Sequence, residues 1–220
     1  MDPGMERRLK KFERIGIFGG TFDPPHIGHQ ILAMEAYDEL KLDKLFWVLA
    51  PQPPHKIGKK ITPIDIRIQM VQAAIQHDEV FEMSTVDIDR PGPHYVLDTV
   101  KIFRSLFPQA TLIFLIGGDS LRDLPEWHQP REFLDACDKL GVMHRPGEKL
   151  NLDELERKLP GLSKKVEFME APLLEISSNQ IRQLVAAGKP FQYYLPQEVY
   201  RIVKEKNLYR QETQDFQNEN

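Results

Sequence analysis

The residues best suited to chemistry follow the apolar run Ile15–Phe18, where the chain reads GGTFDPPHIGH from Gly19 to His29. After a buried strand, a glycine pair lets the backbone turn tightly and bring its N–H groups close to an anion, and the next helix presents its positive N-terminal end. His26 and His29 are three residues apart, so we expect both imidazoles to share one helical face. An isolated pair with this spacing is more often two partly exposed polar side chains. The preceding strand and glycine loop instead favour a nucleotide phosphate site.

Two further segments carry groups that suit an anion. Lys56 follows the proline-rich stretch 51–54, which restricts the loop and limits the entropy lost on binding, so its ammonium can reach a phosphate; an ordinary surface lysine is the alternative. Later, Ser177 or Ser178 can cap a predicted helix, and Arg182 lies one turn into it. A plain cap with a surface arginine explains that segment equally well by itself. The phosphate-binding interpretation is favoured because this would be the second helix start of that type next to the same sheet.

A third group of residues could hold a flat ring. The strand-like stretch 111–116 runs into a glycine pair, which allows a ring to lie against the backbone, and Trp127 follows shortly afterwards as a stacking surface for an aromatic base. The alternative for Trp127 is the core, but the polar residues and proline around it indicate a loop. Tyr95 follows a glycine-proline turn and could line the same pocket or merely pack.

Composition limits the partners and the compartment. The net charge is −4 and the pI is about 6.0, so no global field attracts nucleic acid or an anionic membrane, and any polyanion site must be a local cleft. Cys137 is the only cysteine, which excludes an internal disulfide and favours a reducing, cytoplasmic location; we expect it to be buried and without a role. No apolar run is long enough to span a bilayer. The oligomeric state stays open, a homo-oligomer included.

Short apolar runs alternate with longer amphipathic stretches along the chain. The predicted strands are 14–18, 44–50, 80–87, 111–116, 139–143 and 166–169. The predicted helices are 26–40, 63–76, 95–107, 179–187 and 196–206, and the connectors 131–136 and 152–159 are expected to be helical or irregular. This rhythm predicts an α/β fold with a Rossmann-like doubly wound parallel sheet and ligands at the carboxyl ends of its strands. We expect a single domain (14–209) with C-terminal helices, a flexible N-terminal extension (1–13) and a disordered polar tail (210–220).

These motifs together resemble the nucleotidylyltransferase superfamily with the HxGH signature, and most closely the bacterial nicotinate-nucleotide adenylyltransferase family. The likeness runs in order from about residue 14 to residue 209. GGTFDPPHIGH and the sequence ISSNQIR at 176–182 specify only the superfamily. The nicotinate branch is selected by PPHK at 53–56, GPHY at 92–95 and IGGDS at 116–120 with Trp127. The RPG at 145–147 is shared as well.

The resemblance implies transfer of AMP from ATP to nicotinate mononucleotide, giving deamido-NAD and pyrophosphate in NAD biosynthesis. Magnesium would be held mainly by the ATP phosphates, with no metal ligands from the protein. In-line attack by the substrate phosphate needs no covalent nucleophile, so the protein would work by alignment and charge stabilisation. The catalytic residues implied are His26, His29, Lys56 and Arg182. The implied ATP-binding residues are Gly19, Gly20, Thr21, Phe22, His26, His29, Gly117, Asp119, Ile176, Ser177, Ser178, Ile181 and Arg182. The implied acceptor-binding residues are Lys56, Tyr95, Val96, Thr99, Asp119, Trp127 and His128.

The chain departs from the family pattern at one substrate segment. Many relatives read Ser-Tyr-Thr where this chain has His94, Tyr95 and Val96, so a threonine hydroxyl expected near the nicotinate carboxylate is missing. Backbone N–H groups around Tyr95 and Val96 can bind the carboxylate instead, and His128 can add a contact. We therefore expect nicotinate mononucleotide to be preferred over nicotinamide mononucleotide.

Other functions fit the sequence less well. Adenylyl or cytidylyl transfer to another phosphorylated acceptor, such as nicotinamide mononucleotide or phosphopantetheine, would use the same phosphate chemistry, but the length and Trp127 argue against phosphopantetheine. A non-catalytic nucleotide-binding module could dispense with His29, which is present here. A dehydrogenase would need GxGxxG after the first strand and a P-loop enzyme GxxxxGK[ST]. Neither pattern occurs there.

Overall fold

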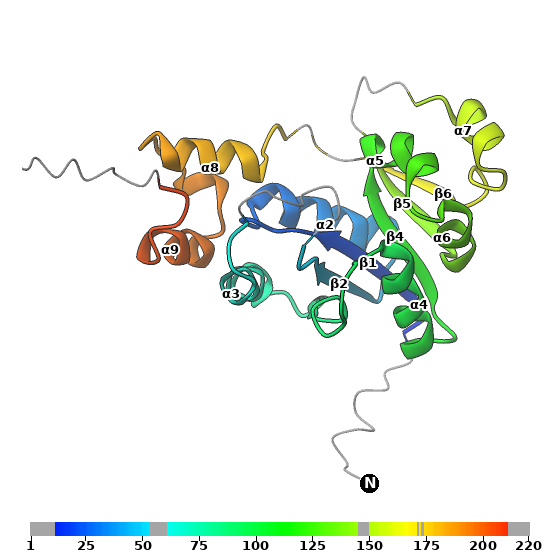
Figure 1. Ribbon diagram of the computed structural model, residues 1–220, viewed down its shortest axis with the longest axis horizontal. Coiled ribbons are helices and arrows are strands. Elements are labelled where there is room, and N and C mark those ends of the chain that lie inside the picture. The colour runs from blue at the N-terminus through cyan, green and yellow to red at the C-terminus, as the bar shows by residue number, and fades with distance from the viewer. Residues whose placement is uncertain (1–11, 53–60, 145–149, 171, 173, 211–220) are drawn as a thin grey trace, which may run out of the picture.

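The chain forms a six-stranded parallel sheet with helices on both faces (Figure 1). This computed structural model describes residues 12–52, 61–144, 150–170, 172 and 174–210. The strands are β1 (Arg14–Gly20), β2 (Lys44–Leu49), β3 (Phe81–Ser84), β4 (Thr111–Gly117), β5 (Lys139–His144) and β6 (Val166–Glu170). Their order across the sheet is β3-β2-β1-β4-β5-β6, and every neighbouring pair is parallel. The chain therefore winds outward from β1 in one direction and from β4 in the other, which confirms the doubly wound prediction.

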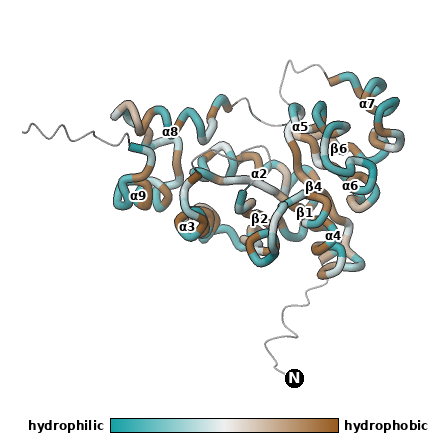
Figure 2. Tube along the Cα trace, viewed as in Figure 1, coloured by the Kyte–Doolittle hydropathy of each residue, from teal (hydrophilic) through white to brown (hydrophobic). Residues whose placement is uncertain are grey.

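Alternate side chains of the central strands enter two separate cores. Trp47 and Leu49 of β2 belong to one buried cluster, whereas Phe46 and Val48 belong to the other. The same alternation holds along β4, because successive side chains of a strand point to opposite faces. Burial on both faces explains why these strands are nearly continuous apolar runs in the sequence. In Figure 2 the strands are accordingly hydrophobic and the outer surfaces of several helices hydrophilic.

The helices divide between the two faces. One face is covered by α2 (Ile27–Glu39), α3 (Ile64–Ile75), α8 (Ser178–Ala186) and α9 (Gln197–Glu205), whose buried residues share one core cluster. The other is covered by α4 (Val96–Leu106), α6 (Pro130–Ala136) and α7 (Leu152–Lys158). Figure 1 shows α8 and α9 at one end of the molecule, where α9 packs against α3. The short helix α5 (Gly118–Asp123) and the 3₁₀ turn Leu124–Glu126 follow β4 directly.

Most predicted elements are present within a few residues of the expected positions. One boundary matters for function: α2 begins at Ile27, so His26 precedes the helix instead of lying in it. The short helix α5 and the two 3₁₀ turns, Leu124–Glu126 and Gln192–Tyr194, were not predicted. The predicted extension and tail fall almost wholly outside the described residues. In the part of the chain that the structure describes, no helix has the length and apolarity needed to cross a membrane.

Candidate active site

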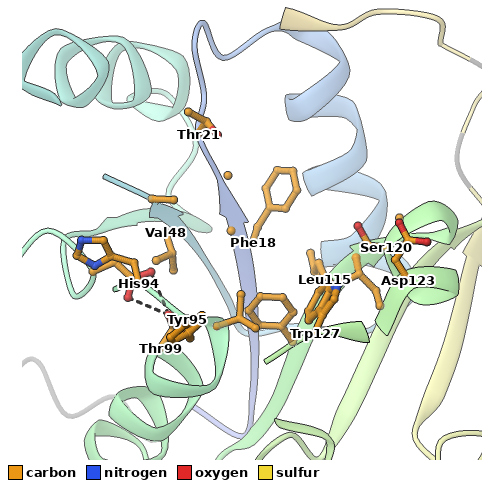
Figure 3. A pocket seen from close by; sticks show the side chains of 18 of the residues that line it. Phe18, Thr21, Val48, His94, Tyr95, Thr99, Leu115, Ser120, Asp123 and Trp127 are labelled. Atoms are coloured by element: carbon orange, nitrogen blue, oxygen red, sulfur yellow. Dashed lines mark hydrogen bonds between the residues drawn. The ribbon is translucent and has the colours of Figure 1, made fainter. Parts of the chain in front are cut away.

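A cavity of about 800 Å³ opens at the carboxyl ends of β1 and β4, where the winding of the sheet reverses. Ligands of open α/β sheets bind at this switch point. The cavity is lined from β1 by Gly19, Gly20 and Thr21, and from the end of β4 by Gly117. Figure 3 shows Thr21 near the end of β1, with His94, Tyr95 and Thr99 on one flank and Ser120 and Asp123 on the other. The two glycine turns singled out in the sequence therefore meet at one cavity.

His26 and His29 hold each other through the start of α2. The backbone N–H of His29 donates to Nδ1 of His26 at 3.3 Å, and the backbone N–H of His26 donates to Nδ1 of His29 at 3.1 Å. This is a reciprocal capping box built from two imidazoles, and it satisfies two N–H groups at the helix start. The rings stack with centroids 3.6 Å apart. The prediction that both histidines share one helical face was wrong for His26, because its side chain caps the helix from outside.

The capping box also sets the protonation of both rings. Burial lowers the pKa of His26 to about 4, and burial together with the neighbouring His26 lowers the pKa of His29 well below its usual value. Both imidazoles are therefore neutral at pH 7. Because each Nδ1 accepts a backbone hydrogen bond, the single ring proton lies on Nε2. The pair offers two neutral N–H donors instead of two cations.

Three aromatic rings pack against the imidazole of His29. Phe22 is 2% exposed and packs edge-on against His29, with ring centroids 5.1 Å apart, while Phe18 and Trp47 complete the cluster. Phe22 has φ of 47°, in the left-handed region that costs a bulky residue about 1–3 kcal/mol, so its burial must outweigh this strain. A Cβ on Gly20 would lie 2.7 Å from the Phe22 ring. The glycine is therefore required for this aromatic packing, and only the backbone of Phe22 can face a ligand.

The start of α8 lies against the loop that precedes α2. Ser177 caps α8 by accepting the N–H of Gln180 at 3.1 Å, which selects Ser177 between the two candidate caps. The hydroxyl of Ser178 donates to the carbonyl of Pro24 at 2.8 Å, and Nη1 of Arg182 donates to the carbonyl of Asp23 at 2.7 Å. The two predicted phosphate-type helix starts, separated by about 150 residues in the sequence, therefore meet in the fold.

The opposite flank of the cavity is aromatic and braced by a buried polar cluster. Tyr95 and His128 stack with centroids 3.9 Å apart, and both line the cavity together with Trp127. Thr99 donates its hydroxyl to Asp87 at 2.8 Å, and Arg90 donates from Nε to the same carboxylate at 3.0 Å. Arg90 also donates to the backbone carbonyls of residues 93 and 95. This cluster fixes the turn that leads into α4.

Some predicted site residues lie elsewhere. Ile181 is fully buried in the core, so its side chain cannot reach a ligand. The side chain of Asp119 is 73% exposed and pairs with Arg122 at 3.2 Å, whereas its neighbour Ser120 lines the cavity. Ile176 packs near Gly28, where an added Cβ would lie 3.6 Å from the Ile176 Cβ. Lys56 falls in 53–60, outside the described residues.

Sequence reasoning missed several residues that hold the site together. Asp23, Asp87 and Arg67 are all buried and polar, and Arg67 donates to four backbone carbonyls around the first glycine loop. Asp23 lies inside the recognised motif, and Asp87 and Arg90 flank the GPHY segment, so their positions gave a signal. Arg67 sits in an amphipathic helix, where an arginine ordinarily indicates a solvent-facing side.

The described residues contain no group of three or more histidines, cysteines, aspartates or glutamates that could hold a metal ion. The oxygens of Asp23 next to the histidine pair already accept hydrogen bonds from Tyr209 and from the Thr62 N–H. Cys137 is buried, as expected, and burial raises the pKa of its thiol to about 12. It therefore stays a protonated, unreactive thiol at neutral pH.

The strand order and the cavity at the switch point define a doubly wound α/β protein with a ligand site between its two halves. A family model described as cytidylyltransferase-like matches residues 17–184, which include both helix starts at the site. The chain belongs to this cytidylyltransferase-like family.

Curated relatives match almost the whole chain. The protein named "Probable nicotinate-nucleotide adenylyltransferase" in Thermomicrobium roseum is 42% identical over 90% of this chain and 92% of its own length. One with the same name in Desulfitobacterium hafniense (strain DSM 10664 / DCB-2) is 38% identical over 90% of this chain and 96% of its own. Among solved structures, a nicotinic acid mononucleotide adenylyltransferase from Plasmodium falciparum, complexed with NaAD, has a TM-score of 0.73 at 19% identity and covers 90% of this chain and 97% of that chain. This structural likeness supports the fold. The two curated relatives confirm the family resemblance that the motifs indicated.

Proposed function

We propose that this protein transfers AMP from ATP to nicotinate mononucleotide, giving deamido-NAD and pyrophosphate. The observation that carries the proposal is the meeting of the α2 and α8 helix starts at the loop that follows Thr21, which itself lines a cavity whose far flank is aromatic. Two such helix starts suit a polyphosphate, because each presents free N–H groups and a positive dipole end. The relatives named above act, by their names, on nicotinate nucleotide.

ATP enters as its magnesium complex, with the metal carried by the phosphates as part of the substrate. His26 and His29 donate from Nε2 to phosphate oxygens, with His29 nearest the reacting centre. Arg182 adds a guanidinium beside them, and Lys56 supplies a further cation. Gly19, Gly20 and Thr21 let the nucleotide approach the backbone closely. The histidines and Arg182 are held by hydrogen bonds before substrate arrives, so they stabilise charge on the departing pyrophosphate without reorganising.

The acceptor occupies the aromatic flank. Trp127 provides a stacking surface for the pyridine ring, next to the Tyr95 and His128 pair. Tyr95 is the N-cap of α4 but makes no side-chain cap, so we assign the N–H groups of Val96 and Leu97 at the start of that helix to a carboxylate. This favours the nicotinate carboxylate over a neutral amide. The acceptor phosphate then attacks the α-phosphorus of ATP in line, the bond to the pyrophosphate breaks, and no covalent enzyme intermediate forms.

The test is a pyrophosphate-release assay with the purified full chain. ATP and CTP are each paired with nicotinate mononucleotide, nicotinamide mononucleotide and phosphopantetheine. We expect the highest kcat/KM with ATP and nicotinate mononucleotide. A higher kcat/KM with the amide would overturn the acceptor, and a higher value with CTP would overturn the donor. Absence of pyrophosphate release with every pair would leave a binding protein and refute catalysis.

A further inference from the structure

Asp23 joins three segments that are far apart in the sequence. It is 6% exposed and follows the glycine turn at the end of β1. Its Oδ1 accepts the hydroxyl hydrogen of Tyr209 at 2.7 Å, and its Oδ2 accepts the backbone N–H of Thr62 at 3.2 Å. Its own carbonyl accepts Nη1 of Arg182 at 2.7 Å. Three residues further on, His26 caps α2, so the position of Asp23 limits where the paired imidazoles can lie.

Two of these contacts come from the C-terminal part of the chain. Tyr209 lies 186 positions after Asp23, just beyond α9, and Arg182 lies in α8. The α9 helix is itself fixed, because it packs against α3 and buries Val199 and Val203 in the core. Tyr209 follows α9 in a turn and packs against the same core, whereas the residues that its hydroxyl binds belong to loops.

The chemistry of this contact makes it persistent. Burial, followed by the neighbouring Asp23 carboxylate, raises the pKa of the Tyr209 hydroxyl above its usual value, so the hydroxyl stays protonated and remains a donor at working pH. A hydrogen bond to a charged acceptor is about twice as strong as one between neutral groups. Without this donor, a buried carboxylate oxygen would lose a partner, which favours movement of the loop towards another donor.

We propose that Tyr209 is a positioning residue for ATP, acting through Asp23 to hold the loop that carries His26. The proposal rests on the function proposed above. Tyr209 binds the carboxylate of Asp23 and Arg182 binds its backbone carbonyl. Together these contacts fix the position of the imidazole pair relative to α8 and α9. The acceptor flank is built on α4 and the segment after β4, so loss of the Tyr209 hydroxyl should disturb ATP and leave acceptor binding unaffected.

The test compares Tyr209→Phe with Tyr193→Phe, the same change at a tyrosine that is 86% exposed. The measurements are kcat, the KM of each substrate, the Kd of a non-hydrolysable ATP analogue by calorimetry, and Tm. For Tyr209→Phe we expect kcat/KM for ATP to fall about tenfold and the analogue to bind several-fold more weakly, with the KM of nicotinate mononucleotide within twofold. Tyr193→Phe should match the wild type throughout. A lower Tm for Tyr209→Phe with unchanged ATP kinetics and analogue affinity would reduce Tyr209 to a structural residue and overturn the proposal.

A double-mutant cycle asks whether the effect passes through Asp23. Asp23→Ala removes the carboxylate that accepts from Tyr209. We expect Tyr209→Phe to cost about threefold or less in that background, against about tenfold in the wild type. Equal costs in both backgrounds would show that the hydroxyl does not act through Asp23. If the wild type released no pyrophosphate with any acceptor, the proposed function would fail, while weaker analogue binding in Tyr209→Phe would still support the positioning role.

Discussion

The sharpest stability prediction concerns Arg67, a charged side chain buried in the core. It is 2% exposed, and its guanidinium donates to the carbonyls of Thr62 at 2.9 Å, Thr21 at 3.0 Å, Ala50 at 2.8 Å and Pro51 at 2.6 Å. One side chain thus joins the phosphate-type loop, the end of β2 and the residues before α3. Burial lowers the pKa of Arg67 from its ordinary value, which shows that desolvation opposes the favourable hydrogen bonds.

We expect Arg67→Met to lower the free energy of unfolding by about 3 kcal/mol. A buried carbonyl that loses its donor costs about 1–3 kcal/mol. Four such carbonyls therefore set an upper limit well above the expected loss of about 3 kcal/mol. Removing the guanidinium also removes its desolvation cost, so the net effect should fall near the lower end of the roughly 3–5 kcal/mol seen when a buried charged partner is deleted. For a chain of this length, about 2–4 °C of Tm per kcal/mol gives a fall of roughly 6–12 °C.

Urea denaturation followed by tryptophan fluorescence, together with calorimetry, measures this change. The matched control is Arg201→Met on α9, an arginine with 55% exposure that pairs with Glu198, and it should shift stability by less than about 0.5 kcal/mol. Arg67→Lys should fall between the two, because an ammonium keeps the charge but cannot reach four carbonyls as a planar fork does. A loss below about 1 kcal/mol for Arg67→Met would show that water or loop movement satisfies the carbonyls, and would refute the reasoning.

Three further predictions concern the site. The pKa of His26 is lowered to about 4, so the unfolded chain binds its proton first as the pH falls below 6.5, and stability is lost from there down towards pH 4. Between pH 7 and pH 5, His26 should account for about 2 kcal/mol of the loss. In urea titrations at both pH values, His26→Asn, which keeps a cap, should remove that share and leave the share that comes from His29. His29→Ala should remove about 2–4 kcal/mol of transition-state stabilisation and so lower kcat, with little change in acceptor affinity. A near-normal kcat would exclude a catalytic role for His29. Trp127→Ala should mainly raise the KM of the pyridine nucleotide in steady-state assays, and an unchanged KM would assign the ring to packing against Phe133.

The sheet could be predicted because its signals are local. Each central strand is buried on both faces, so it appears as a short apolar run, and the helices between the strands have the length that parallel crossovers require. A serine cap at position 177 or 178 was also predictable, since a hydroxyl at the start of a helix is a local pattern, and the structure then selected Ser177. The short helix α5 was not, because six residues are too few to establish a period.

Contacts within the site were predictable only where a motif carried them. The motifs placed the α2 and α8 starts at one ligand, and the structure brings them together through Ser178 and Arg182. No local pattern could pair Asp23 with Tyr209 across 186 positions. The role of Arg67 could not be predicted either. Its position fits an amphipathic helix, but the four carbonyls to which it donates belong to residues outside that helix.

The paired histidines show why the motif points to chemistry beyond helix capping. An asparagine or serine at position 26 would cap α2 at least as well, without a ring that loses its proton on burial. The two imidazoles make the protein less stable below pH 6.5, because burial lowers the pKa of both. Capping uses only Nδ1 of each ring, which leaves Nε2–H of each ring as a further donor. The stability lost to the imidazoles is consistent with the role proposed for them, in which the phosphates of ATP accept those two hydrogen bonds.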